Sequence, residues 1–182
     1  MLLVDGRADD LLSFTQGAVG LFPEDPEIRL IYATALAPQS AERARWEAAQ
    51  AIQLDTHDPG RLIRAARLML NLGEVETARA YARRAAQLAP ANFPFAPELH
   101  AVSGVLAAIS GDYGLAEDAL RAAHEAEPDR ATFARDLARL LDSRGRKVEA
   151  LGVVEAAIAA GADPKELEKV REEISTGGES RT

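Results

Sequence analysis

The chain has 182 residues, of which 47% are hydrophobic and 5% aromatic, and it carries a formal net charge of −8. It contains no cysteine, which excludes a disulfide framework, a cysteine zinc site and a thiol nucleophile. The acidic charge argues against a nucleic acid ligand, because such binding depends on neutralising phosphates.

The first residues do not resemble a signal peptide, because the apolar run of residues 1–4 is short and acidic residues follow it. No apolar run approaches the length of roughly 18 residues that a membrane-spanning helix needs. We therefore expect a cytoplasmic protein without a membrane span. Two alternatives stay open, a signal peptide removed from ahead of residue 1 and a longer parent protein of which this chain is a fragment.

Residues 1–24 are expected to form an N-terminal capping helix or half of a repeat. Gly6 is expected to make a turn, and the apolar spacing that follows predicts a helix over 8–21. Pro23 ends that helix. The helix has no complete partner before it in the sequence.

Four similar units follow, each predicted to be a pair of helices joined by a turn. Gly145 follows Gly111 by 34 residues, and Ala150 follows Ala116 by the same distance. Self-similarity at this period is typical of helical repeat arrays. The segment 91–96 interrupts the period. The predicted units are 25–58, 59–92, 97–130 and 131–164.

The small and apolar residues that recur at this period predict which faces of the helices are buried. In the first helices they predict Leu62, Ala65, Ala66 and Met69 of the second unit as core residues. The same spacing places Ile28, Ile31, Tyr32 and Ala35 inward in the first unit, His100, Ser103, Gly104 and Ala107 in the third, and Ala134, Leu137, Ala138 and Leu141 in the fourth. In the second helices it predicts Ala44, Ala48, Ala51 and Leu54 of the first unit, Ala78, Ala82, Ala85 and Leu88 of the second, and the equivalents of the alanines in the later units.

The C-terminal part is predicted to end the array. A polar helix over 165–174 has one narrow apolar stripe, which is typical of a capping helix. Residues 175–182 are polar and rich in glycine, and a disordered tail is expected there.

The turn glycines, the small residues on both helices and the closing prolines together resemble tetratricopeptide repeat proteins over residues 25–164. The resemblance implies an all-α fold, a right-handed α-solenoid of helix–turn–helix repeats. It also implies a chaperone-like scaffold or adaptor without enzymatic activity or cofactor, which binds a protein or peptide on the concave face of its first helices. The chain departs from the family in lacking the turn glycine in the first unit and in having Ala162 where a proline is usual.

In the frame of the repeats, the concave face carries five arginines against three acidic residues around an apolar middle. This composition favours a partner with an amphipathic or acidic segment. The alternative is that these arginines pair with neighbouring acids and contribute little. The candidate residues are Arg29, Ile63, Arg64, Arg67, Asn71, Val102, Val105, Ile109, Arg135 and Arg139.

Three aromatic residues stand apart from the repeat pattern. Phe93 and Phe95 lie in the segment that interrupts the period, where they either fill the joint or anchor a partner. Trp46 is expected to pack against residues 11–22, with a dimer contact as the alternative.

No catalytic pattern emerges from the sequence. The three histidines, His57, His100 and His124, fall in different units, and no two have the spacing of a helical metal site. We therefore expect no enzymatic activity and no metal or cofactor. The favoured function is protein–protein recognition in the concave groove, and the alternative is a structural unit that forms a homo-oligomer through its terminal helices.

Overall fold

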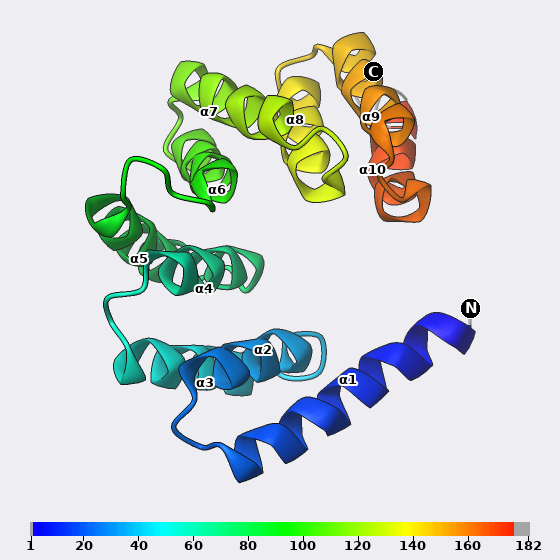
Figure 1. The fold of residues 1–182 in the computed structure, drawn as a ribbon. Coiled ribbons are helices and arrows are strands. Elements are labelled where there is room, and N and C mark those ends of the chain that lie inside the picture. Colours follow the sequence, from blue (N-terminus) through cyan, green and yellow to red (C-terminus); the bar gives the residue numbers. More distant parts are fainter. Residues whose placement is uncertain (1, 177–182) are drawn as a thin grey trace. The chain divides into compact units, whose positions relative to one another are not determined.

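The computed structural model describes residues 2–176, with side chains from residue 10 onward. Within this range the chain forms ten α-helices and no strand, so the predicted all-α repeat fold is confirmed (Figure 1). The sense in which the repeats wind stays a prediction. The helices are α1 (Leu2–Leu21), α2 (Pro26–Leu36), α3 (Ala41–Leu54), α4 (Pro59–Asn71), α5 (Val75–Leu88), α6 (Ala96–Ile109), α7 (Tyr113–Ala126), α8 (Ala131–Ser143), α9 (Lys147–Ala160) and α10 (Pro164–Thr176).

The chain divides into two compact units, one ending at Ala91 and the other beginning at Asn92. In the first unit, α2 packs on α1 and α3, α4 packs on α5, and both α2 and α3 contact α4. In the second unit, α6 pairs with α7 and α8 pairs with α9, while α10 covers α8 and α9. Each unit therefore consists of stacked helical hairpins.

Aspartate followed by proline begins the first helix of two consecutive repeats. The carboxylate of Asp25 accepts hydrogen bonds from the backbone N–H groups of Glu27 (2.8 Å) and Ile28 (3.0 Å). Asp58 caps α4 in the same way, accepting from Gly60 (2.8 Å) and Arg61 (3.1 Å). In both helices the proline occupies the first turn, where its missing N–H group costs nothing.

The turns inside three of the hairpins depend on glycine. Gly73, Gly111 and Gly145 have φ angles of 79°, 83° and 77°, a left-handed conformation that other residues adopt only at a cost. The first hairpin has no such glycine, and its turn instead uses the N–H groups of Gln39 and Ser40, which both donate to the carbonyl of Leu36.

The second helices bury the small residues predicted from the repeat. These residues are at most 4% exposed, and most of them are alanines, whose small side chains allow neighbouring helices to pack closely. They are Ala44, Ala48, Ala51, Ala78, Ala82, Ala85, Ala116, Leu120, Ala123, Ala150, Val154 and Ala157. The prediction is wrong for Leu54 and Leu88, which are the last residues of α3 and α5 and are 45% and 37% exposed. The first-helix prediction is also confirmed for the second and fourth units, where Leu62, Ala65, Ala66, Met69, Ala134, Leu137, Ala138 and Leu141 are buried.

The predicted inward face of α2 is wrong by one residue. The buried residues of α2 are Leu30, Tyr32, Ala33 and Leu36, whereas Ile31 is 41% exposed. The two Asp-Pro caps lie 33 residues apart and not 34, because the hairpin without a turn glycine is one residue shorter. The buried positions of α2 are therefore found by counting from its own N-cap, Asp25, and not by applying the period of 34 residues.

Three further expectations are corrected. Gly6 makes no turn, since α1 is helical from Leu2, and one glycine inside a helix costs only about 1 kcal/mol. His100 and Ser103 are exposed, because α6 turns Ala101, Gly104 and Ala107 toward the core of its unit. The last helix continues to Thr176, and residues 177–182 of the predicted tail lie outside the described residues.

Candidate functional site

Two of the predicted groove residues are fully buried. Ile63 on α4 and Val102 on α6 have no exposed surface. In each case the side chain lies between packed helices, where it contributes to the hydrophobic stabilisation of its unit. A partner could reach neither residue without displacing a helix, and we leave both out of the candidate surface.

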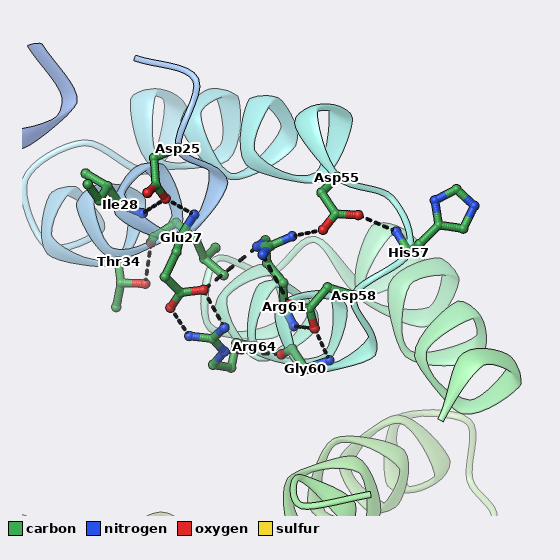
Figure 2. A network of polar contacts seen from close by, with 11 residues as sticks. Asp25, Glu27, Ile28, Thr34, Asp55, His57, Asp58, Gly60, Arg61 and Arg64 are labelled. Carbon is green, nitrogen blue, oxygen red and sulfur yellow. Dashed lines mark hydrogen bonds and ion pairs between the residues drawn. The ribbon is translucent and has the colours of Figure 1, made fainter. Parts of the chain in front are cut away.

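The first helices α2 and α4 are joined by arginine–carboxylate pairs (Figure 2). The Arg64 guanidinium donates two hydrogen bonds to the carboxylate of Glu27, one from each terminal nitrogen, and the second is 2.7 Å long. This hydrogen bonding raises the pKa of Arg64 above its ordinary value. Arg64 is therefore already engaged by an acid of the preceding repeat.

Arg61, one turn before Arg64, is the centre of the same network. Its guanidinium lies 2.8 Å from the carboxylate of Asp55 and 3.1 Å from that of Asp58, and Glu27 is 3.8 Å away. The hydrogen bond from Arg61 is the largest cause that lowers the pKa of Asp55, followed by the backbone N–H group of His57. Figure 2 shows these carboxylates converging on Arg61 from α2, from the turn after α3 and from the start of α4.

Arg29 also serves the packing of its own unit. It forms an ion pair of 2.6 Å with Glu47 on α3, and it donates a hydrogen bond of 2.6 Å to the carbonyl of Pro23. Its guanidinium lies 6.0 Å from the centre of the Trp46 ring. Arg29 stands at the position that Leu62 takes in the next repeat, counted from the Asp-Pro caps. The charge of Arg29 is therefore paired with Glu47 inside the α2–α3 hairpin.

The predicted groove residues of the second unit lie on α6 and α8. Arg139 pairs with Glu173 of α10 at 3.0 Å, and Arg135 lies 3.6 Å from Asp136. Val105 is half-buried against the core, while Ile109 is 53% exposed at the end of α6. The apolar and charged residues predicted here are thus present, but the arginines are paired within the unit.

The interpretation of the groove changes in two ways. Arg29, Arg64, Arg135 and Arg139 all have acidic neighbours, as the alternative interpretation of the sequence held. The sequence reasoning also missed two exposed residues of α2, Ile31 and Thr34. The signal that could have found them is the spacing of 33 residues between the two Asp-Pro caps. Arg67 is half-buried on α4, and Asn71 is exposed at its end.

The aromatic residues of the joint are split between packing and exposure. Phe93 is 8% exposed and Phe95 is 38% exposed, and their ring centres lie 5.7 Å apart in a tilted arrangement. Phe93 is therefore a packing residue, and only Phe95 offers surface to a partner. Trp46 is 57% exposed and is covered on one side by Arg29.

Two general features bear on function. Among the residues whose side chains are described, histidine and acidic residues form no group of three that could hold a metal ion. Over residues 2–176, the chain contains no helix with the length and apolar character needed to cross a bilayer.

A family model and several solved structures are similar to this chain. Residues 107–174 match the family model of the tetratricopeptide repeat. A thermophilic TPR (tetratricopeptide repeat) protein from Thermus thermophilus superimposes with a TM-score of 0.75 at 24% identity, over 96% of this chain and 92% of the other. The chain has the tetratricopeptide repeat fold. No curated protein matches it by sequence.

Two further solved structures are also similar to this chain. PilW, a type IV pilus biogenesis factor, superimposes with a TM-score of 0.69 at 16% identity, over all of this chain and 89% of the other. The APC/C hetero-tetramer Cut9–Hcn1 gives a TM-score of 0.70 at 16% identity, over 91% of this chain and 32% of the other. At these identities the similarity establishes the tetratricopeptide fold, which generally serves as a protein–protein interaction scaffold.

Proposed function

We propose that this chain is a non-enzymatic adaptor that binds a segment of a partner protein across its first helices. The observation that carries the proposal is an exposed surface of mixed character on α2 and α4. Ile31 and Thr34 are exposed on α2, and Asn71 is exposed on α4. The Glu27–Arg64 pair joins the two helices.

The chemistry of this surface favours an amphipathic partner segment. Ile31 offers an apolar contact, and Thr34 and Asn71 offer hydrogen-bonding groups. An acidic partner residue would have to compete with Glu27 for Arg64, so a purely acidic ligand fits this surface less well. The similar hetero-tetramer Cut9–Hcn1 supports a role in assembly with another protein. The proposal keeps the cytoplasmic location expected from the sequence.

Site-specific photo-crosslinking tests the proposal. The photoreactive residue p-benzoylphenylalanine replaces Ile31 in one variant and Asn71 in another, and in a control it replaces Gln53, which is exposed on the second helix α3. Cells of the source organism are irradiated, and the crosslinked proteins are identified by mass spectrometry. We expect one partner to crosslink from Ile31 and Asn71 and not from Gln53.

Two results would contradict the proposal. One is the same set of proteins from all three positions, which indicates random collision. The other is the absence of any crosslinked protein although the variants keep the helix content of the wild type by circular dichroism. A catalytic activity found in the purified chain would contradict its non-enzymatic part.

Self-association through α1 is a second candidate. The side of α1 that includes Leu12 and Val19 packs against the cluster of Tyr32, Leu36 and Ala44. A different side of the helix carries exposed apolar residues, among which Phe14 is 75% and Leu21 is 76% exposed. Exposed apolar surface of this kind is typical of an interface.

Light scattering after size exclusion at increasing concentration tests this second candidate. If α1 mediates assembly, the mass rises with concentration, and the double variant Phe14→Glu with Leu21→Glu stays monomeric. The control carries the same added charge on another exposed side of α1, as Ser13→Glu with Gln16→Glu. A wild type that is monomeric at every concentration would contradict self-association.

A further inference from the structure

A hollow of about 420 Å³ lies beside the outer face of α5 in the first unit. Five of its residues follow one another at helical spacing on α5, and the sixth belongs to the turn between α3 and α4. The opposite face of α5 packs into the core through Ala78, Ala82 and Ala85. The hollow is lined by His57, Ala80, Arg83, Arg84, Gln87 and Leu88.

The turn that carries His57 is held in place by the Arg61 network. The backbone N–H group of His57 donates a hydrogen bond of 2.9 Å to Asp55, and Asp55 accepts one of 2.8 Å from Arg61. Figure 2 shows the His57 ring pointing away from this network. The acidic residues on either side of His57 in this turn, Asp55 and Asp58, are both engaged by Arg61, and neither lines the hollow.

The charge of the hollow differs from that of the rest of the chain. Arg83 and Arg84 are both exposed, and in the described part of the chain neither forms an ion pair or a hydrogen bond. By contrast, Arg29, Arg61 and Arg64 of the same unit are each paired with an acid. Among the residues that the structure describes, no acidic side chain lines the hollow, although the protein as a whole has a net charge of −8.

We infer that this hollow binds a carboxylate-rich segment of a protein partner. Arg83 and Arg84 both line the hollow, and their guanidinium groups present planar donors that match the geometry of carboxylates. The amide of Gln87 adds a donor and an acceptor, and Leu88 and Ala80 provide apolar contact for a side chain between the acidic ones. The inference rests on the proposed function in one respect, that the ligand is a protein. The two surfaces are different, because the hollow lies on the second helix α5 and the proposed partner surface lies on the first helices α2 and α4.

Fluorescence anisotropy with a defined peptide tests the inference. The probe is a fluorescein-labelled peptide with four Glu residues around two Leu residues, and its control has Gln at each Glu position. Binding is measured at low ionic strength to the full chain, because salt screens exposed charges. We expect the acidic peptide to bind and the Gln peptide not to bind.

A matched pair of variants locates the binding. Arg83→Gln with Arg84→Gln should weaken the acidic peptide about tenfold, since two charge-assisted contacts are lost. Lys165→Gln with Lys169→Gln changes the net charge by the same amount on exposed positions of α10 and should leave the affinity unchanged. Glutamine has a helix propensity close to that of Arg and Lys, so both variants should keep the helix content of the wild type.

Three results would overturn the inference. The wild type fails to bind the acidic peptide, or the Lys variant weakens it as much as the Arg variant does. The third result is that the acidic peptide does not bind, whereas inorganic phosphate binds and requires Arg83 and Arg84 to do so. The hollow would then be a phosphate site. The crosslinking at Ile31 and Asn71 is independent of this assay, so the failure of one is distinguishable from the failure of the other.

Discussion

The guanidinium group of Arg64 on α4 donates two hydrogen bonds to the carboxylate of Glu27, which lies 37 residues earlier on α2. This pair connects the first helices of two consecutive repeats at a place where the sequence pattern suggested a cation available to a ligand. Alongside it, Arg61 contacts three carboxylates of the same unit. Stacking of the first two repeats therefore depends on polar pairs as well as on small buried residues.

Removing Arg61 should destabilise the first unit more than removing Arg64. The Arg61 side chain is 9% exposed, whereas Arg64 is 36% exposed and its contribution is reduced by solvent. We expect Arg61→Gln to lower the free energy of unfolding by about 2 kcal/mol, as for lost hydrogen bonds between charged groups. Arg64→Gln should cost less than about 1 kcal/mol. Urea denaturation measures both, and equal losses would contradict the difference in burial.

The cap of α4 gives a second prediction. Asp58 accepts hydrogen bonds from two backbone N–H groups and also lies 3.1 Å from the Arg61 guanidinium. Asp58→Ala removes both functions and should cost roughly 1–2 kcal/mol of stability. Asp58→Asn keeps a capping oxygen and loses the charge, so it should cost less. The reverse order in thermal unfolding would show that the charge matters more than the cap.

Two helical glycines should respond in opposite directions to the same substitution. A Cβ at Gly104 would lie 2.7 Å from Leu120 Cγ and 3.1 Å from the carbonyl oxygen of Ala116, so Gly104→Ala forces α6 and α7 apart. We expect a net loss of about 1–3 kcal/mol, as for overpacked cores. A Cβ at Gly152 on α9 meets nothing within 4 Å, and Gly152→Ala should stabilise by about 0.5–1 kcal/mol. Denaturation midpoints of the two variants on the same side of the wild type would contradict this.

The second unit should lose stability in acid through a carboxylate network between α7 and α9. Hydrogen bonds from Arg146 and Arg121 lower the pKa of Glu117, and those from Arg121 and Arg146 lower the pKa of Glu149. A lowered folded-state pKa means that the stabilisation is complete above the ordinary Glu value of about 4.3. It is lost as the pH falls through the folded-state values.

Unfolding measured between neutral pH and strong acid checks this expectation. The double variant Glu117→Gln with Glu149→Gln should be less stable than the wild type at neutral pH and should lose less stability as the pH falls. The control is Glu155→Gln with Glu168→Gln, two exposed acids outside the network, which should keep the slope of the wild type. A slope that is unchanged in the network variant would contradict the assignment.

The candidate site was harder to predict than the fold because it depends on register and pairing. A period of 34 residues located the buried small residues of every second helix. It misplaced the inward face of α2, since the shorter hairpin after Leu36 shifts that helix by one residue. One residue turns a helix by about 100°, which is enough to exchange a buried face for an exposed one.

The sequence by itself determined the all-α repeat fold, because helix caps, turn glycines and small residues are local signals repeated along the chain. It could not decide which arginines are available to a partner. Arg29 and Glu47 are 18 residues apart, and Arg139 and Glu173 are 34 apart, and each pair meets only when helices pack. The tertiary structure alone decided that these charges are paired and that Arg83 and Arg84 have no ion-pair partner among the described residues, because pairing depends on distances between helices and not on spacing along the chain.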